Sequence, residues 1–277
     1  MNNDKVKRYS ENLLDYLNFN INSQSTVIYM AGSLCEGFGN EKSDIDVYVL
    51  TNRQFIDDIE AGLNSNDVFS INDTNLAHNF IIENQRFDVE FWELEKVMEG
   101  IGQFNAIDFH SERHMGKIND GIFDMLHRMK YAIPVYNKED FESIFQKLDQ
   151  RKFKYYQAIK KTEQYDSWLE DLEGAYRSYD YGTMFFLSRH LIDNAVVAFL
   201  AINGETNPNI KWLYRKLARF SESTKNNIIE QRYIYLQNRN YQPDQIDQQI
   251  RETLDFTQKI NINTQQLILT MQKEGVQ

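Results

Sequence analysis

The residues best suited to chemistry are two carboxylates, Asp44 and Asp46, in a run where polar and apolar residues alternate. If this run is a β-strand, both carboxylates lie on one face, while Ile45, Val47 and Val49 lie on the other. At a rise of roughly 3.3 Å per residue, the two acids are about 7 Å apart along the strand. Like charges this close repel each other unless a cation lies between them. The pair therefore predicts a site for Mg²⁺, which prefers oxygen ligands and retains water or phosphate as the others.

A second feature lies just upstream, where an apolar strand predicted over 26–30 is followed by Gly32 and Ser33. Glycine allows the backbone to turn sharply and to approach a ligand closely. Ser33 adds a hydroxyl and an N–H at a candidate helix N-terminus, which is a favourable position for an anion. Together with a divalent cation, this turn predicts a phosphorylated ligand.

The strand, the Gly-Ser turn, a polar loop and a Ser-Asp-hydrophobic-Asp motif follow one another, with Asp44 eleven residues after Ser33. This order resembles the signature of the DNA polymerase β-like nucleotidyltransferase superfamily. The resemblance implies that Asp44 and Asp46 bind two Mg²⁺ ions, and that Gly32, Ser33 and Ser43 bind the nucleoside triphosphate. One ion would lower the pKa of the attacking hydroxyl and the other would neutralise the triphosphate, so that pyrophosphate leaves in line.

The superfamily also requires a third carboxylate on a later, neighbouring strand. The alternating segment 85–92 places Asp88 and Glu90 on one face. The resemblance favours Asp88 as the third metal ligand, because in the family this acid follows a basic residue and lies between two hydrophobic ones. Glu90 stays open as the alternative and as a residue that contacts substrate. A simpler interpretation makes Asp44 and Asp46 solvent-facing residues of a half-exposed strand, but it leaves the Gly-Ser turn and Asp88 unexplained.

The elements that position these residues form a β, α, β, β pattern. Amphipathic helices are predicted over 4–18 and 52–63, and strands over 26–30, 44–50, 68–71, 79–82 and 85–92. After residue 93 the pattern is helical, with a break at Pro134, because the residue before a proline is disfavoured in helices. The predicted fold is α+β: a small mixed sheet with flanking helices as a catalytic domain at 1–134, then an all-helical bundle at 135–277 that binds substrate.

This domain order is similar to that of the aminoglycoside-type and biosynthetic small-molecule nucleotidyltransferases, in which a helical substrate domain follows the sheet. The resemblance extends to Arg189, Asp193 and Lys211. It implies that Arg189 and Lys211 contact phosphate and that Asp193 is a general base or binds an amine. Alternatively, Arg189 and Asp193 form a structural ion pair, and Lys211 is a solvated or capping residue near a helix start.

The composition of the chain limits the classes of partner that it can bind. The net charge is −11, from 30 basic and 41 acidic residues, so a phosphate polymer is repelled overall and a cationic small molecule is attracted. The single cysteine excludes an intramolecular disulfide framework and a cysteine-based zinc cluster. The sequence has neither an apolar run of about 18 residues nor a signal-peptide core, which predicts a cytoplasmic protein with no membrane partner.

These features predict a Mg²⁺-dependent nucleotidyltransferase. It would transfer a nucleoside monophosphate, with AMP from ATP preferred over other nucleoside triphosphates, to a hydroxyl of a small molecule and release pyrophosphate. One alternative has a protein or tRNA as the acceptor. Another is a non-catalytic nucleotide-binding module. No motif identifies the acceptor, the preferred base or the oligomeric state.

Overall fold

The computed structural model describes residues 2–17, 26–63, 68–71, 75–109, 114, 116–206 and 209–273. The chain divides into two compact units: a sheet unit, Met1–Ala106 with Gly121–Leu148, and a helical unit, Ile107–Asp120 with Asp149–Gln277. The chain thus leaves the sheet unit and returns to it. The predicted α+β class, with a mixed sheet and a helical C-terminal region, is confirmed.

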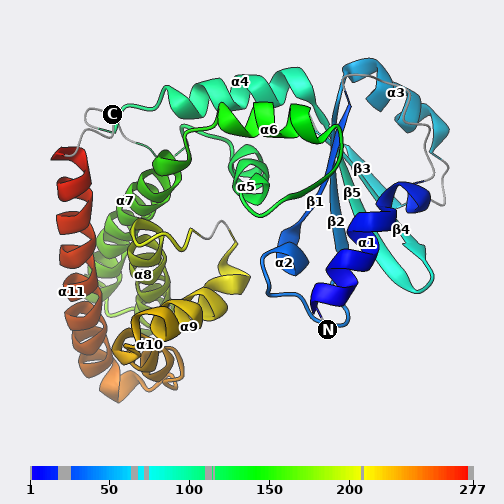
Figure 1. The fold of residues 1–277 in the computed structure, drawn as a ribbon. Helices are drawn as coiled ribbons and strands as arrows, with labels where there is room; N and C mark the ends of the chain where they lie inside the picture. The colour runs from blue at the N-terminus through cyan, green and yellow to red at the C-terminus, as the bar shows by residue number, and fades with distance from the viewer. Residues whose placement is uncertain are drawn as a thin grey trace. The chain divides into compact units, whose positions relative to one another are not determined.

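The sheet unit contains a six-stranded sheet in the order β3-β4-β5-β2-β1-β6. Its β2 and β5 strands are parallel and the other neighbouring pairs are antiparallel, which makes the sheet mixed (Figure 1). The strands are β1 (Val27–Ala31), β2 (Ile45–Thr51), β3 (Val68–Ile71), β4 (Asn75–Ile82), β5 (Gln85–Glu93) and β6 (Ile133–Tyr136). The helices are α1 (Asn2–Tyr16), α2 (Gly32–Cys35), α3 (Arg53–Gly62), α4 (Leu94–Asn105), α5 (Asp120–Met129) and α6 (Lys138–Gln146).

The two faces of the sheet differ in chemistry. One face is apolar: Val47 and Val49 of β2 and Val89 of β5 are fully buried in a core that includes Leu13 of α1 and Ile56 of α3. The alternation predicted for β2 is therefore confirmed, because its apolar residues enter this core. The other face carries the polar residues of the same strands, and a residue of α5 and one of α6 contact aromatic side chains on it.

Pro134, where the sequence predicts the domain boundary, lies within β6 and pairs with Tyr29 of β1. Proline has no N–H for a ladder hydrogen bond, and it is tolerated here because β6 is an edge strand. The sheet unit continues through α6 to Leu148, and the segment 107–120 belongs to the helical unit. The predicted boundary between 134 and 135 does not coincide with this division.

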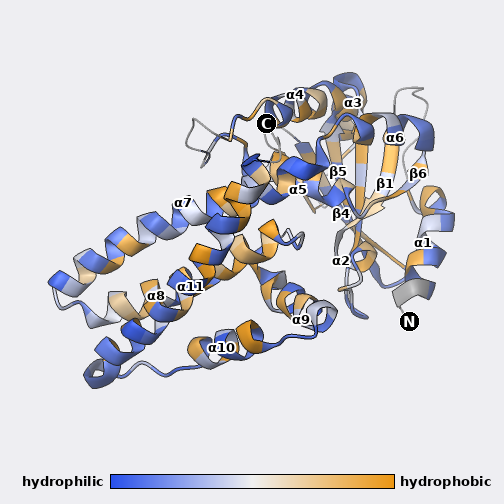
Figure 2. Cartoon of the chain, turned by 60° about the vertical axis from the view of Figure 1, so that its left-hand side comes forward, coloured by the Kyte–Doolittle hydropathy of each residue, from blue (hydrophilic) through white to orange (hydrophobic). Residues whose placement is uncertain are grey.

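The helical unit is organised around α8, which packs against both α7 and α11. Among the described residues, α8 alone is long and apolar enough to cross a membrane, but 72% of its most apolar 18 residues are buried, as in a core helix. The longer α7 is mostly hydrophilic (Figure 2). The elements are α7 (Gln150–Arg177), α8 (Tyr181–Ile202), η1 (Ile210–Trp212), α9 (Leu213–Thr224), α10 (Ile228–Gln237), η2 (Pro243–Gln245) and α11 (Ile246–Lys273).

Candidate functional site

Two of the predicted carboxylates are neighbours on the polar face of the sheet, and the third directly precedes it in the chain. Asp46 on β2 is the direct register partner of Asp88 on β5. Because neighbouring strands are about 4.8 Å apart and register partners share a face, these two side chains lie side by side. Asp44 directly precedes β2, two residues before Asp46. Asp44 makes no hydrogen bond or ion pair within the described part of the chain, so its oxygens are open to a ligand.

The Gly-Ser turn lies against this cluster. Gly32 has a φ of +80°, in the left-handed region that favours glycine. A Cβ atom placed on Gly32 would be 1.9 Å from Oδ2 of Asp46, so a larger residue at this position would displace the carboxylate. Ser33 follows in the four-residue helix α2, and its carbonyl accepts a hydrogen bond of 2.8 Å from the backbone N–H of Phe38. The backbone at Gly32 thus lies in close contact with Asp46, whereas the predicted contact with a phosphate stays a prediction.

Ser43 shapes the loop that leads to Asp44. Its Oγ accepts a hydrogen bond of 2.8 Å from the backbone N–H of Asn40. Its carbonyl accepts hydrogen bonds of 3.0 Å from both Lys5 Nζ and Gln85 Nε2. These three hydrogen bonds of Ser43 hold the loop that leads into β2.

Two arginines form ion pairs with Asp88 and Asp46. Arg86 donates from Nε to Oδ1 of Asp88 at 2.7 Å and from Nη2 to Oδ2 at 3.2 Å. Arg128 on α5 donates from Nη1 to Oδ1 of Asp46 at 3.4 Å and from Nε to Oδ2 of Asp124 at 2.7 Å. The Arg86 side chain is 49% exposed and that of Arg128 is 22% exposed, so Arg86 is the freer of the two to rotate away.

Glu90 belongs to a separate hydrogen-bond network. Its Oε1 accepts a hydrogen bond of 3.1 Å from the hydroxyl of Tyr48. Its Oε2 accepts from Asn75 Nδ2 at 3.1 Å and from Trp92 Nε1 at 2.9 Å. Both oxygens are thus satisfied by uncharged donors, and Glu90 is the register partner of Tyr48. This arrangement favours Asp88 over Glu90 as the third carboxylate.

Burial raises the pKa of three acids on this face, Asp46, Asp88 and Glu90. Burial raises the pKa of Asp46 to about 6, with Asp88, Glu90 and Asp44 adding to the rise and Arg128 opposing it. Burial also raises the pKa of Asp88 above its ordinary value, against the effect of Arg86. The pKa of Glu90 is raised by burial as well. Neighbouring acids that all resist ionisation are typical of a binding or catalytic site.

In the helical unit, Arg189 and Asp193 bind α10. Arg189 donates from Nη2 to the carbonyl of Gln237, the last residue of α10, and from Nη1 to that of Arg239, two residues further on, at 3.5 Å. Oδ1 of Asp193 accepts from the Tyr233 hydroxyl at 3.0 Å and from Gln237 Nε2 at 2.8 Å. Each residue separately ties α8 to α10, and no ion pair joins the two within the part of the helical unit that is described.

Lys211 lies in the short helix η1, and its side chain is exposed. Its backbone N–H donates to Oδ1 of Asn209 at 3.1 Å, and its Nζ is 5.0 Å from the centroid of the Trp212 ring. Among the residues that the structure describes, the side chain of Lys211 has a cation–π contact with its neighbour Trp212.

Comparison with known proteins adds little. No protein-family model matches the sequence, and no curated protein matches it significantly. Among solved structures, the chain is similar to a nucleotidyltransferase-like protein from Exiguobacterium sibiricum, with 9% identity and a TM-score of 0.46, over 100% of this chain and 81% of that one. At so low a TM-score this likeness carries no weight for fold or activity.

Two neighbours of the cluster were not predicted. Arg128 reaches Asp46 from 82 residues further along the chain, and nothing in its own segment signals that contact. Asn79 Nδ2 donates to Oδ1 of Asp88 at 3.0 Å across the β4–β5 hairpin. The contact of Arg86 with Asp88 can be inferred from the sequence, because residues two apart on a strand share a face.

The donor set fits a divalent cation, although the side chains are not yet arranged around one. Among the described residues, no three His, Cys, Asp or Glu side chains already form a metal-binding group. Arg86 and Arg128 instead pair with Asp88 and Asp46. The chemistry still suits Mg²⁺: the carboxylate oxygens are hard ligands, Asp44 is open, and the exposed Arg86 can rotate to release Asp88.

Proposed function

We propose that this chain is a Mg²⁺-dependent nucleotidyltransferase. It transfers a nucleoside monophosphate, with AMP from ATP as the first candidate, to a hydroxyl of a small molecule and releases pyrophosphate. The observation that carries the proposal is the register pairing of Asp46 with Asp88, beside the close backbone approach at Gly32. A glycine backbone can approach a phosphate closely, and neighbouring acids can hold its cation.

In this proposal Asp44, Asp46 and Asp88 hold the metal. When bound, Mg²⁺ lowers the pKa of the attacking hydroxyl and neutralises charge on the phosphates. Asp46 lies between the other two and anchors the cluster, while Asp88 stands beside the incoming hydroxyl. The Gly32 and Ser33 backbone, with the Ser33 hydroxyl, holds the terminal phosphates.

The acceptor is proposed to be small and cationic, because the chain carries a net charge of −11. Arg189 and Asp193 are engaged with α10, so they are weaker candidates for substrate contact than the sequence indicates. The exposed Lys211 stays a candidate for binding phosphate. A protein or tRNA acceptor is the alternative, and the same assay tests it.

A second candidate function is a nucleotide-binding module without catalysis. The observation that favours it is the pairing of Arg86 with Asp88 and of Arg128 with Asp46, which supplies positive charge without a metal. Under this alternative both arginines keep their partners when the nucleotide binds, and no turnover follows.

The deciding experiment measures pyrophosphate release from each of the four common nucleoside triphosphates with Mg²⁺ and a panel of small-molecule, protein and tRNA acceptors. The variants are Asp46→Asn and Asp88→Asn, with Asp58→Asn on α3 as the matched control, because Asp58 is exposed and bonds only to Gln54 among the described residues. We expect release by the wild type and the control alone. Equal release by Asp46→Asn would refute the proposal, and calorimetric ATP binding without turnover would establish the second candidate.

A further inference from the structure

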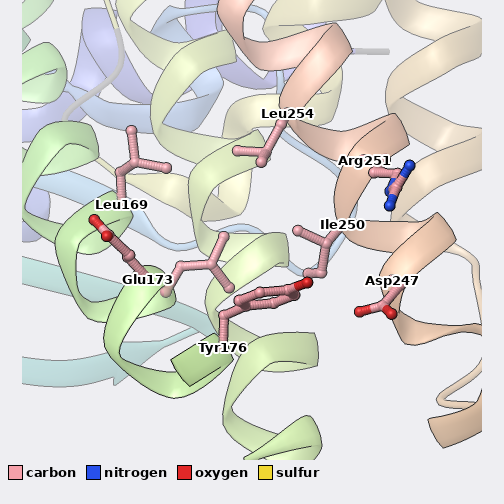
Figure 3. A pocket seen from close by; sticks show the side chains of 8 residues that line it. Leu169, Glu173, Tyr176, Asp247, Ile250, Arg251 and Leu254 are labelled. Atoms are coloured by element: carbon pink, nitrogen blue, oxygen red, sulfur yellow. The ribbon is translucent and has the colours of Figure 1, made fainter. Parts of the chain in front are cut away.

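A cavity of about 420 Å³ lies within the helical unit, between the C-terminal half of α7 and the N-terminal half of α11 (Figure 3). Its aliphatic lining consists of Leu169 and Leu172 of α7 and Ile250 and Leu254 of α11. The volume falls within the range of roughly 300–1,000 Å³ that is typical of small-molecule sites. The cavity is therefore large enough for a small organic molecule.

The cavity exists because α7 and α11 both pack chiefly against α8. Leu172 and Ile250 are 3% and 6% exposed and belong to the core that α8 shares, so they form the floor. Leu169 and Leu254 are only partly buried and form the walls. The cavity thus has a buried apolar floor and two partly exposed apolar walls.

Tyr176 gives the cavity an aromatic surface. Its ring lies across the middle of the space, with the hydroxyl directed toward α11 (Figure 3). The residue is 52% exposed, which is high for an aromatic side chain between two helices. An exposed ring face of this kind attracts both apolar groups and cations.

The charges at the rim favour a cation. Asp247 makes no hydrogen bond or ion pair with any residue that the structure describes, so its carboxylate is available. Glu173, on the opposite wall, already pairs with Arg177. Arg251, one turn beyond Asp247 on α11, also lines the cavity (Figure 3). The charged lining thus consists of two carboxylates and one guanidinium, and the carboxylate that is not already paired is that of Asp247.

We propose that this cavity binds a small amine with an apolar, preferably aromatic, body and one ammonium group. The body occupies the space between the leucines and Ile250, and the ammonium lies between the Tyr176 ring and the carboxylate of Asp247. An anion of the same shape would meet that carboxylate and be repelled. This site is independent of the nucleotidyl transfer proposed above, because it uses none of the same residues.

The test uses three matched probes with the full-length protein: 2-phenylethylamine, 2-phenylethanol and 3-phenylpropionate, which share a phenyl ring and differ in the polar end. Binding is followed by the NMR shifts of labelled leucine and isoleucine methyl groups. We expect the amine to shift the methyl groups of Leu169, Leu172, Ile250 and Leu254, and to bind at least about threefold more tightly than the alcohol. The propionate should bind more weakly than both.

Two variants, each with a matched control, locate the interaction. Asp247→Asn should lower the affinity for the amine to that for the alcohol. The control is Asp255→Asn, because Asp255 is exposed, lies on α11 as well and pairs with Lys259. It should leave the affinities for the amine and the alcohol unchanged. Leu169→Trp should fill the cavity and abolish binding, whereas Leu267→Trp, at a partly exposed position outside the cavity, should not. The proposal is overturned if the amine leaves the four methyl groups unmoved, if the three probes bind equally, or if binding survives Leu169→Trp.

Discussion

Asp46 in the sheet unit and Asp193 in the helical unit are both partly buried aspartates, and burial raises the pKa of each. Their surroundings are opposite. Asp193 faces two donors, the Tyr233 hydroxyl and Gln237 Nε2, which favour its charged form. Asp46 faces Asp88 and other carboxylates, which oppose its charged form, and a single arginine at 3.4 Å.

The contrast indicates that Asp193 has a structural role and that Asp46 is suited to bind a ligand. A charge that the protein itself solvates contributes to folding, whereas a group of like charges lowers stability until a cation arrives. On this basis we expect the two aspartates to respond differently to substitution, to pH and to Mg²⁺.

The largest difference concerns activity. Asp46→Asn should reduce pyrophosphate release by about 10³-fold or more, because it removes a central ligand of the metal. Asp193→Asn should reduce it by less than about tenfold, since the amide oxygen can still accept from Tyr233. Both variants are compared at saturating Mg²⁺ and ATP. Comparable losses in the two variants would mean that the helical unit takes part in the chemistry and would break the contrast.

The next largest effect is structural. Gly32→Ala places a methyl group against the Asp46 carboxylate and forces alanine to a φ of +80°, so we expect a loss of about 3 kcal/mol in the free energy of unfolding. Gly102→Ala is the matched control, because a Cβ there meets nothing within 4 Å and the position lies within α4. It should stabilise the protein by about 0.5–1 kcal/mol. Urea unfolding measures both, and equal values would mean that Gly32 is not in close contact with Asp46.

Much of the sheet unit was predictable, because local alternation determines which face of a strand is buried. The pattern of β2 and β5 correctly places Val47 and Val89 in the core, and hence Asp46 and Asp88 on the opposite face. What local pattern cannot supply is the register between strands distant in the chain. That Asp46 is opposite Asp88 and Tyr48 is opposite Glu90 emerges only from the paired strands.

Contacts from other elements were not predictable. Arg128 comes from α5, whose sequence indicates only an amphipathic helix. The strand β6 was missed because its proline is typical of a break, yet an edge strand accepts proline. The hydrogen bonds of Arg189 could not be predicted from its own segment either, because their acceptors are the backbone carbonyls of Gln237 and Arg239, far along the chain.

The two arginines allow a finer comparison within the cluster. Arg128→Met should cost about 2 kcal/mol in the free energy of unfolding, because it leaves Asp46 and Asp124 without their partner in a partly buried setting. Arg86→Gln should cost less than about 1 kcal/mol, because its pair with Asp88 is far more exposed. Thermal or urea unfolding without divalent cations provides the measurement. A larger loss for Arg86→Gln would reverse our assignment of Arg86 as the arginine that yields to the metal.

The smallest effect is the pH dependence, and its sign follows from the pKa values. The pKa of Asp46 is raised from 3.8 to about 6 in the folded state. Between these values the folded state binds more protons than the unfolded state, so the contribution of Asp46 to stability falls as the pH rises. Asparagine does not titrate. The stability of Asp46→Asn relative to the wild type should therefore increase from pH 4 to pH 6 by about 1 kcal/mol and then stay level.

Mg²⁺ separates this effect from that of Asp193, whose pKa is raised in the same direction and whose asparagine variant should show a slope of the same sign. Above pH 6, millimolar Mg²⁺ should stabilise the wild type and Asp193→Asn, because both retain ionised carboxylates around Asp46. Mg²⁺ should leave the stability of Asp46→Asn unchanged. Its stabilising effect on the wild type should disappear as the pH falls below 6, because protons then compete with the metal for the carboxylate. Calorimetric melting temperatures with and without Mg²⁺ measure this, and equal stabilisation of all three proteins would place the metal elsewhere.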